Sequence, residues 1–180
     1  NPMKVISFSS IKGGVGKTTS CCNLAFYFAS KGKKVVVIDF DSQGGATHHL
    51  SNKFKKSFRA SIYDILIGKV KPTSALHEYC ENLYLIPTSL SFSEISYKDF
   101  SAELKKIVEA LNDFDLLLFD LSPAIYPGST IPLGVSDYVV VPVDCAGGLS
   151  VLGLKAEEKL IKAVKKLRLL GIIPTMCDRT

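Results

Sequence analysis

The segment from residue 11 to residue 19, Ile-Lys-Gly-Gly-Val-Gly-Lys-Thr-Thr, constrains the fold of this chain more than any other feature. It contains the pattern G-x-x-G-K-T, between an apolar run predicted to be a strand (Val5–Ser9) and a predicted helix (Thr18–Ser30). Glycines let such a loop curl so that its N–H groups point at phosphate oxygens, and the positive end of the helix dipole points at the same place. We therefore predict a phosphate-binding loop between the first strand and the first helix.

Two side chains of this loop carry specific chemistry. The ammonium group of Lys17 is placed to reach the β- and γ-phosphates of a nucleotide, and the hydroxyl of Thr18 is placed to ligate Mg²⁺. A Gly-rich turn without a ligand is the alternative, but it does not require a Lys-Thr pair at this spacing. The expected nucleotide-binding residues are Lys12, Gly13, Gly14, Val15, Gly16, Lys17, Thr18 and Thr19.

Short apolar runs alternate with helical patterns along the rest of the chain. The runs predict strands at Val35–Asp39, Leu83–Pro87, Leu116–Asp120, Tyr138–Pro142 and Gly171–Thr175, and the helical patterns predict helices at Ile62–Ile67, Phe100–Leu111 and Leu152–Leu170. This alternation indicates βαβ units, and hence an α/β fold: a doubly wound, mostly parallel sheet with helices on both faces. Together with the phosphate loop, this pattern resembles the fold of P-loop NTPases. The polar stretch Ser42–Arg59 is predicted to be a surface loop.

Three carboxylates follow two of the predicted strands. Asp39 and Asp41 end one buried run, and Asp120 ends another. Ligands of open α/β sheets bind beyond the carboxyl ends of the strands, so these side chains are expected beside the phosphate loop. Oxygen ligands on a stiff support suit Mg²⁺. A solvated strand end is the alternative for each.

Length and composition limit the classes of protein. The chain has 180 residues, 47% of them apolar and 22% charged, which suits a single globular domain that we place at residues 3–180. Residues 1–2 have the character of a cloning scar before Met3, and neither a signal peptide nor an apolar run long enough to span a bilayer is expected. Five cysteines without a C-x-x-C pair argue against a disulfide framework or zinc site and suit the cytoplasm.

Residues 12–18, Lys-Gly-Gly-Val-Gly-Lys-Thr, resemble the deviant Walker A motif K-G-G-x-G-K-T of the ParA/MinD family of ATPases. Residues 41–47, Asp-Ser-Gln-Gly-Gly-Ala-Thr, are similar to the D-P-Q-G-N-A-T of the ParA branch, with Ser42 for Pro and Gly45 for Asn. Residues 174–180 resemble a T-M-Y-D-R-R-T stretch of the same branch. ParA proteins run further at the C-terminus, so the resemblance implies a family C-terminal portion that this chain does not include.

The resemblance implies a function and roles for residues. It implies binding of ATP and Mg²⁺, an ATP-dependent homodimer in which Lys12 reaches the partner's nucleotide, and hydrolysis to ADP and phosphate. Such a dimer would bind DNA non-specifically, respond to a ParB-like activator and partition plasmids or chromosomes, in the cytoplasm at the nucleoid. The implied catalytic residues are Lys12, Lys17 and Asp41, and the implied metal-site residues are Thr18, Asp39 and Asp120.

The net charge of +5 permits contact with a polyanion. Four lysines recur on one face of the predicted helix 152–170 and are candidates for DNA contacts, with an ordinary solvated face as the alternative: Lys155, Lys159, Lys162 and Lys166. Two other functions stay open at this point. A MinD-like membrane-positioning ATPase would need an amphipathic tail, and an iron-protein-like cluster scaffold would need cluster cysteines, for which Cys145 is the best-placed candidate.

Overall fold

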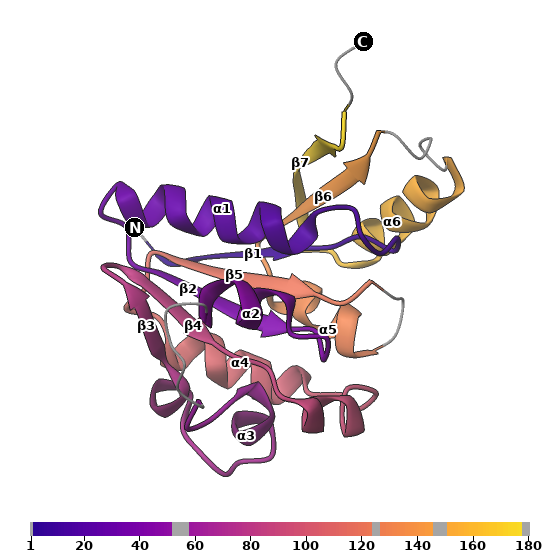
Figure 1. The fold of residues 1–180 in the computed structure, drawn as a ribbon. Helices are drawn as coiled ribbons and strands as arrows, with labels where there is room; N and C mark the ends of the chain where they lie inside the picture. Colours follow the sequence, from indigo (N-terminus) through magenta and orange to yellow (C-terminus); the bar gives the residue numbers. More distant parts are fainter. Residues whose placement is uncertain (1, 52–57, 124–126, 146–150, 178–180) are drawn as a thin grey trace.

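The computed structural model describes residues 2–51, 58–123, 127–145 and 151–177. They form a seven-stranded sheet in the order β3-β4-β2-β5-β1-β6-β7, in which every neighbouring pair is parallel except β3 and β4 (Figure 1). The strands are β1 (Lys4–Phe8), β2 (Val35–Phe40), β3 (His77–Cys80), β4 (Leu83–Ile86), β5 (Leu116–Leu121), β6 (Tyr138–Asp144) and β7 (Arg168–Thr175). The doubly wound, mostly parallel α/β fold is confirmed.

Helices cover both faces of this sheet. They are α1 (Lys17–Ser30), α2 (Gly45–Ser51), α3 (Ile62–Leu66), α4 (Ser101–Ala110), α5 (Pro127–Val135) and α6 (Val151–Ala163), with 3₁₀ turns at Pro72–Ala75 and Leu90–Glu94. None of the helices in the described part of the chain combines the length and the apolar character needed to cross a membrane.

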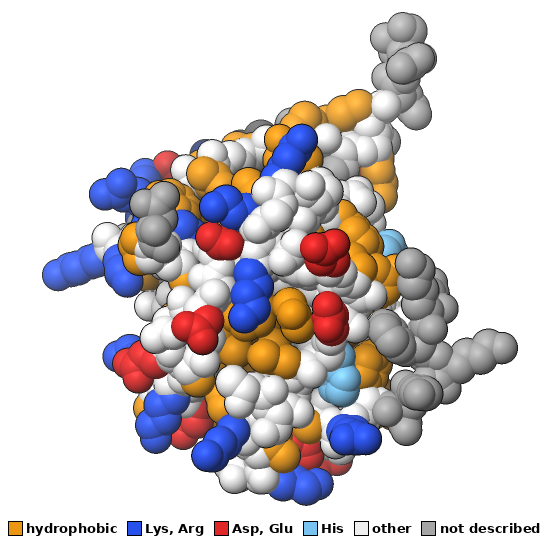
Figure 2. Space-filling view, turned by 90° about the vertical axis from the view of Figure 1, so that its left-hand side faces the viewer, with side chains coloured by type: hydrophobic (Ala, Val, Ile, Leu, Met, Phe, Trp, Pro, Cys, Tyr) orange, Lys and Arg blue, Asp and Glu red, His pale blue; other side chains and the backbone are white. Residues whose placement is uncertain are grey.

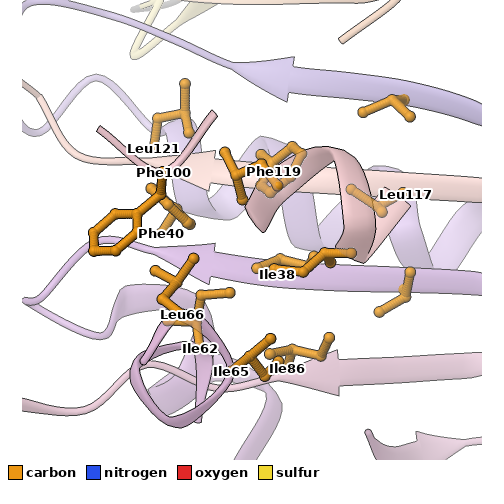
Figure 3. Packing of buried hydrophobic residues seen from close by; sticks show 14 of the residues in the cluster. Ile38, Phe40, Ile62, Ile65, Leu66, Ile86, Phe100, Leu117, Phe119 and Leu121 are labelled. Carbon is orange, nitrogen blue, oxygen red and sulfur yellow. The ribbon is translucent and has the colours of Figure 1, made fainter. Parts of the chain in front are cut away.

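Strand β2 shows how the sequence builds two cores. Its residues are all buried, and their side chains alternate between the two faces of the sheet. Val35 and Val37 pack in the cluster that includes the α1 cysteines, Cys21 and Cys22. On the other face, Phe40 contacts Phe119 with ring centroids 5.9 Å apart, in the cluster that holds α3 and α4 (Figure 3).

The order of strands positions the candidate site. Strand β5 lies between β1 and β2, and the strands run in the same direction, so their carboxyl ends meet at one edge. In this register Asp39 of β2 is paired with Asp120 of β5, and the loop after β1 starts at the same edge. The amino ends of these strands lie on the opposite side, where Figure 2 shows basic and acidic side chains interspersed.

The predicted helix 152–170 is wrong in its second half. Helix α6 ends at Ala163, and residues 168–170 already belong to β7. Pairing with β6 decides this boundary, because the N–H of Arg168 donates to the carbonyl of Asp137 at 3.1 Å and Tyr138 stands opposite Arg168 in the ladder. Lys166 therefore lies in the turn after α6 and does not extend the lysine face of the helix.

The prediction of a surface loop at Ser42–Arg59 is also wrong in part. Residues 45–51 form α2, because Ala46 and Leu50 are buried against α1 and the sheet. Residues 52–57 lie outside the described residues. The antiparallel strand β3 and helix α5 were not predicted, since β3 has the mixed pattern His-Glu-Tyr-Cys and α5 contains Pro132.

Candidate nucleotide-binding site

The loop between β1 and α1 has the backbone that its glycines predict. Gly14 and Gly16 have φ angles of 72° and 82°, a region that side chains with a Cβ rarely adopt. Gly16 is the N-cap of α1, and no side chain of the described residues caps this helix end, so its first N–H groups are available to an anion. The carboxyl end of β7 supports the loop, because the hydroxyl of Thr175, the last residue of that strand, donates to the carbonyl of Val15 at 2.9 Å.

Lys17 is the first residue of α1, and only 7% of it is exposed. Burial lowers the pKa of this ammonium group, while Asp120, Asp41 and Glu157 act in the opposite direction. The lysine is therefore a buried cation surrounded by acidic groups at the start of the helix. A polyphosphate that entered the loop would bring further negative charge to it.

Thr18 and Asp120 form the candidate cation site. The hydroxyl of Thr18 donates to Oδ2 of Asp120 at 2.7 Å, and Asp120 is only 1% exposed. Burial and the nearby Asp39 raise the pKa of Asp120 to about 7. Its other oxygen, Oδ1, is buried and has no hydrogen-bond partner within the described residues. An unsatisfied carboxylate oxygen beside a hydroxyl matches the oxygen ligands that Mg²⁺ takes in proteins, so these residues fit the ion.

Asp39 is fully buried, but its oxygens already have partners. Oδ2 accepts from the N–H of Thr47 in α2 at 2.7 Å, and Oδ1 accepts from the N–H of Asp41 at 3.2 Å. Burial raises its pKa to about 6 despite these bonds. In this arrangement Asp39 stands beside Asp120 in the sheet and holds the start of α2 and the backbone of Asp41 at the site.

The segment after β2 approaches the phosphate loop closely. A Cβ atom on Gly45 would lie 2.8 Å from the Thr18 hydroxyl oxygen, so glycine is what allows α2 to begin there. Asp41 is partly exposed, and its Oδ1 accepts from the N–H of Gln43 at 3.0 Å. Asp41, the acidic residue that the sequence linked to hydrolysis, therefore lies in a tight turn directly after β2, near enough to Lys17 to act on its pKa.

Lys12 differs from Lys17 in its surroundings. Its side chain is 54% exposed, and its ammonium group forms an ion pair of 2.9 Å with Oδ2 of Asp144. Asp144 ends β6, and sequence reasoning did not select it, although an acidic residue ending an apolar run was the signal that identified Asp39 and Asp120. A half-exposed ion pair contributes little stability, so Lys12 can exchange Asp144 for another anion at small cost.

The lysines predicted to contact DNA are only partly brought together. Lys155, Lys159 and Lys162 are exposed on α6, and Lys162 pairs with Glu158 at 2.6 Å. Lys166 lies beyond the helix, 3.8 Å from Asp137. Sequence reasoning also passed over Glu157, a buried residue of α6 whose carboxylate is bonded to the start of the phosphate loop.

The fold and the site together define a P-loop nucleotide-binding protein. A glycine loop leads from the sheet into α1, and a buried lysine and acidic residues lie at the same edge of the sheet. A family model described as an AAA domain matches residues 3–170. The chain is 34% identical over 179 residues to the chromosome-partitioning ATPase Soj of Thermus thermophilus, covering 96% of this chain and 69% of that protein. It therefore belongs to the ParA/MinD family of ATPases, on the Soj/ParA branch.

Solved structures agree with this assignment. A plasmid partition protein of Borrelia burgdorferi is 30% identical, has a TM-score of 0.89, and is matched over 99% of this chain and 82% of its own. Cobyrinic acid a,c-diamide synthase of Mycobacterium smegmatis, crystallised with an ATP analogue and magnesium, is 28% identical with a TM-score of 0.89 over 99% of this chain and 77% of its own. The same fold thus holds a nucleotide and magnesium in that enzyme.

Proposed function

We propose that this protein is a ParA-like partition ATPase. It binds ATP and Mg²⁺, dimerises with the nucleotides enclosed between the two copies, holds DNA without sequence preference, and hydrolyses ATP to release it. A ParB-like protein stimulates turnover, and the complex works in the cytoplasm at the nucleoid. The relatives on the Soj/ParA branch support this choice over the membrane-positioning and cluster-scaffold alternatives.

The contrast between the two loop lysines carries the proposal. Lys17 is buried at the helix start, where it serves the phosphates of its own chain, whereas Lys12 is half exposed at the rim of the same loop. A half-exposed lysine at the rim of the loop, as Lys12 is, can reach a phosphate bound by a facing copy. There it would stabilise the charge that develops on the transferred phosphoryl group, as an arginine finger does.

The remaining roles follow from the geometry of the site. Thr18 and Asp120 would hold Mg²⁺, which when bound neutralises charge on the phosphate oxygens. Asp41, beside the phosphate loop and partly exposed, orients the attacking water. Asp39 keeps Asp41 and the start of α2 in place through its bonds to two backbone N–H groups.

The exposed lysines of α6 provide the surface for DNA. Lys155, Lys159 and Lys162 lie on one side of the helix and are exposed, so phosphates can approach them. Contacts to phosphates alone give affinity without sequence preference, which suits a protein that must hold any part of a chromosome.

The test is DNA binding with ATP and Mg²⁺ across a series of salt concentrations. Replacement of the three α6 lysines by Gln should lower the affinity and reduce the slope of log K against log salt by about 2 to 3, at roughly 0.9 per lost phosphate contact. A matched control replaces three other exposed lysines by Gln: Lys98, Lys105 and Lys106. Equal losses in both triple variants would exclude α6 as the DNA surface, and binding that ignores ATP in the unaltered protein would contradict the proposed function.

A further inference from the structure

A buried glutamate connects α6 to the start of the phosphate loop. Glu157 lies in the middle of α6 and is only 4% exposed, and it is the one glutamate among the buried charged residues of the described chain. Its neighbour Glu158 is exposed and pairs with Lys162 on the surface. The two adjacent acids of this helix therefore have different environments, and only the first points toward the sheet.

Both oxygens of Glu157 have a partner in the segment that leads into the loop. Oε1 accepts from the hydroxyl of Ser9, and Oε2 accepts from the N–H of Ile11 at 3.1 Å. Ser9 is itself buried and its N–H donates to the carbonyl of Val140 in β6. The Glu157 carboxylate thus binds the chain at Ser9 and at Ile11, immediately before Lys12.

A buried carboxylate is costly unless its oxygens are satisfied, and bonds to an ionised acceptor are stronger than bonds between neutral groups. The two bonds of Glu157 meet this requirement and fix the backbone at Ile11 relative to α6. The same charge also acts on Lys17, where it opposes the fall in pKa that burial causes. Glu157 therefore contributes both to the shape of the loop entrance and to the potential inside it.

The opposite side of α6 carries the lysines. A helix turns about 100° per residue, so Lys155, Lys159 and Lys162 lie on the side away from Glu157. One helix thus has the start of the phosphate loop on one side and an exposed basic surface on the other. A shift of Ile11 when the loop takes up a nucleotide must either break the Glu157 bond or move α6.

We propose that Glu157 is a positioning residue that sets the loop entrance at Ile11 and Lys12 and transmits the nucleotide state of the loop to the lysine surface of α6. The second half of this inference rests on the proposed function, because it takes α6 as the DNA surface. The first half concerns ATP binding alone and stands without DNA.

The experiment compares Glu157→Ala, Glu157→Gln and Ser9→Ala with the control Glu158→Ala, which removes the same charge one position along the same helix. Titration with a fluorescent ATP analogue and Mg²⁺ measures affinity, and steady-state hydrolysis separates KM from kcat. Loss of the bonds in Glu157→Ala should weaken nucleotide binding and raise KM about tenfold. Glu157→Gln keeps an acceptor for Ile11 and should recover most of the loss, and Ser9→Ala should lose less than Glu157→Ala.

DNA binding without ATP, and with ATP at a concentration that saturates each variant, then tests the transmission. Glu157→Ala should bind DNA equally in both conditions, whereas Glu158→Ala should keep the ATP dependence of the unaltered protein. Nucleotide affinity in Glu157→Ala within twofold of Glu158→Ala would overturn the positioning role, whatever the DNA result. If the unaltered protein shows no ATP-dependent DNA binding, the proposed function fails while the nucleotide titrations still decide the role of Glu157. Should Glu157→Ala not fold, Ser9→Ala, which removes one of the two bonds, carries the comparison, and a nucleotide affinity within twofold of Glu158→Ala would then overturn the positioning role.

Discussion

Replacement of Asp120 by Asn should stabilise the protein in the absence of nucleotide and metal. Asp120 is buried, one of its oxygens is unsatisfied within the described residues, and its pKa rises from 3.8 to about 7. At about 1.36 kcal/mol per pH unit, that rise makes the ionised carboxylate of the folded protein unfavourable by about 4 kcal/mol. An asparagine removes this charge but buries an amide that needs its own partners, which costs about 2 kcal/mol. We expect a net gain of about 2 kcal/mol at pH 8.

The stability gain of Asp120→Asn should fall as the pH falls. The pKa is higher in the folded state than in the unfolded state, so the folded protein binds the proton more tightly. The destabilisation is therefore fully present above about pH 7 and is relieved as the pH falls toward 4. The advantage of Asp120→Asn should shrink steadily between pH 8 and pH 5. Other titrating groups contribute equally to the unfolding free energy of both proteins, so their contributions cancel when the two proteins are compared at each pH.

The assay is urea unfolding in EDTA at pH 8, 7, 6 and 5, with Asp113→Asn as the control at an exposed aspartate. Addition of Mg²⁺ and ATP should make the unaltered protein the more stable of the two, since it gains ligand-binding free energy that the variant lacks. The reasoning is refuted if Asp120→Asn is less stable than the unaltered protein at pH 8, or if the difference between them does not change with pH.

Three further outcomes follow from single contacts. Gly45→Ala should weaken Mg²⁺–ATP binding, because the new Cβ would lie 2.8 Å from the Thr18 hydroxyl. Gly134→Ala, whose Cβ would meet no atom of the described residues within 4 Å, should bind normally in the same calorimetric titration. Thr175→Val keeps the volume but loses the bond to the phosphate loop; a stability loss of about 1 kcal/mol with weaker nucleotide binding is expected, and unchanged binding would count against support of the loop by β7. Leu50→Ala should cost about 2–5 kcal/mol of unfolding free energy in denaturant titration, and a loss under 1 kcal/mol would mean that α2 is not packed as described.

The local parts of the site could be predicted from the sequence. The φ angles at Gly14 and Gly16 and the helix start at Lys17 follow from neighbouring residues, so the motif alone indicates them. Asp39 and Asp120 could also be placed, because parallel strands bring their carboxyl ends to one edge.

The contacts between distant segments could not be predicted. Lys12 pairs with Asp144, and Ile11 bonds to Glu157, across more than 100 residues of sequence. Which residues so far apart in the sequence come into contact is decided by the packing of the whole fold, and local sequence patterns do not indicate it. The end of α6 was misplaced for the same reason, since apolar residues at helical spacing continue past Ala163 and only pairing with β6 turns them into a strand. Helix α2 was missed because two buried residues within a polar stretch are a weak pattern.

The mass of the protein in solution with ATP and Mg²⁺, measured by light scattering, tests the central claim most directly. The account predicts twice the monomer mass for the unaltered protein, a dimer that persists in Asp41→Ala while hydrolysis is lost, and a monomer that still binds nucleotide in Lys12→Ala. A monomer in all three proteins, each with nucleotide bound, would contradict the account and remove the role assigned to Lys12.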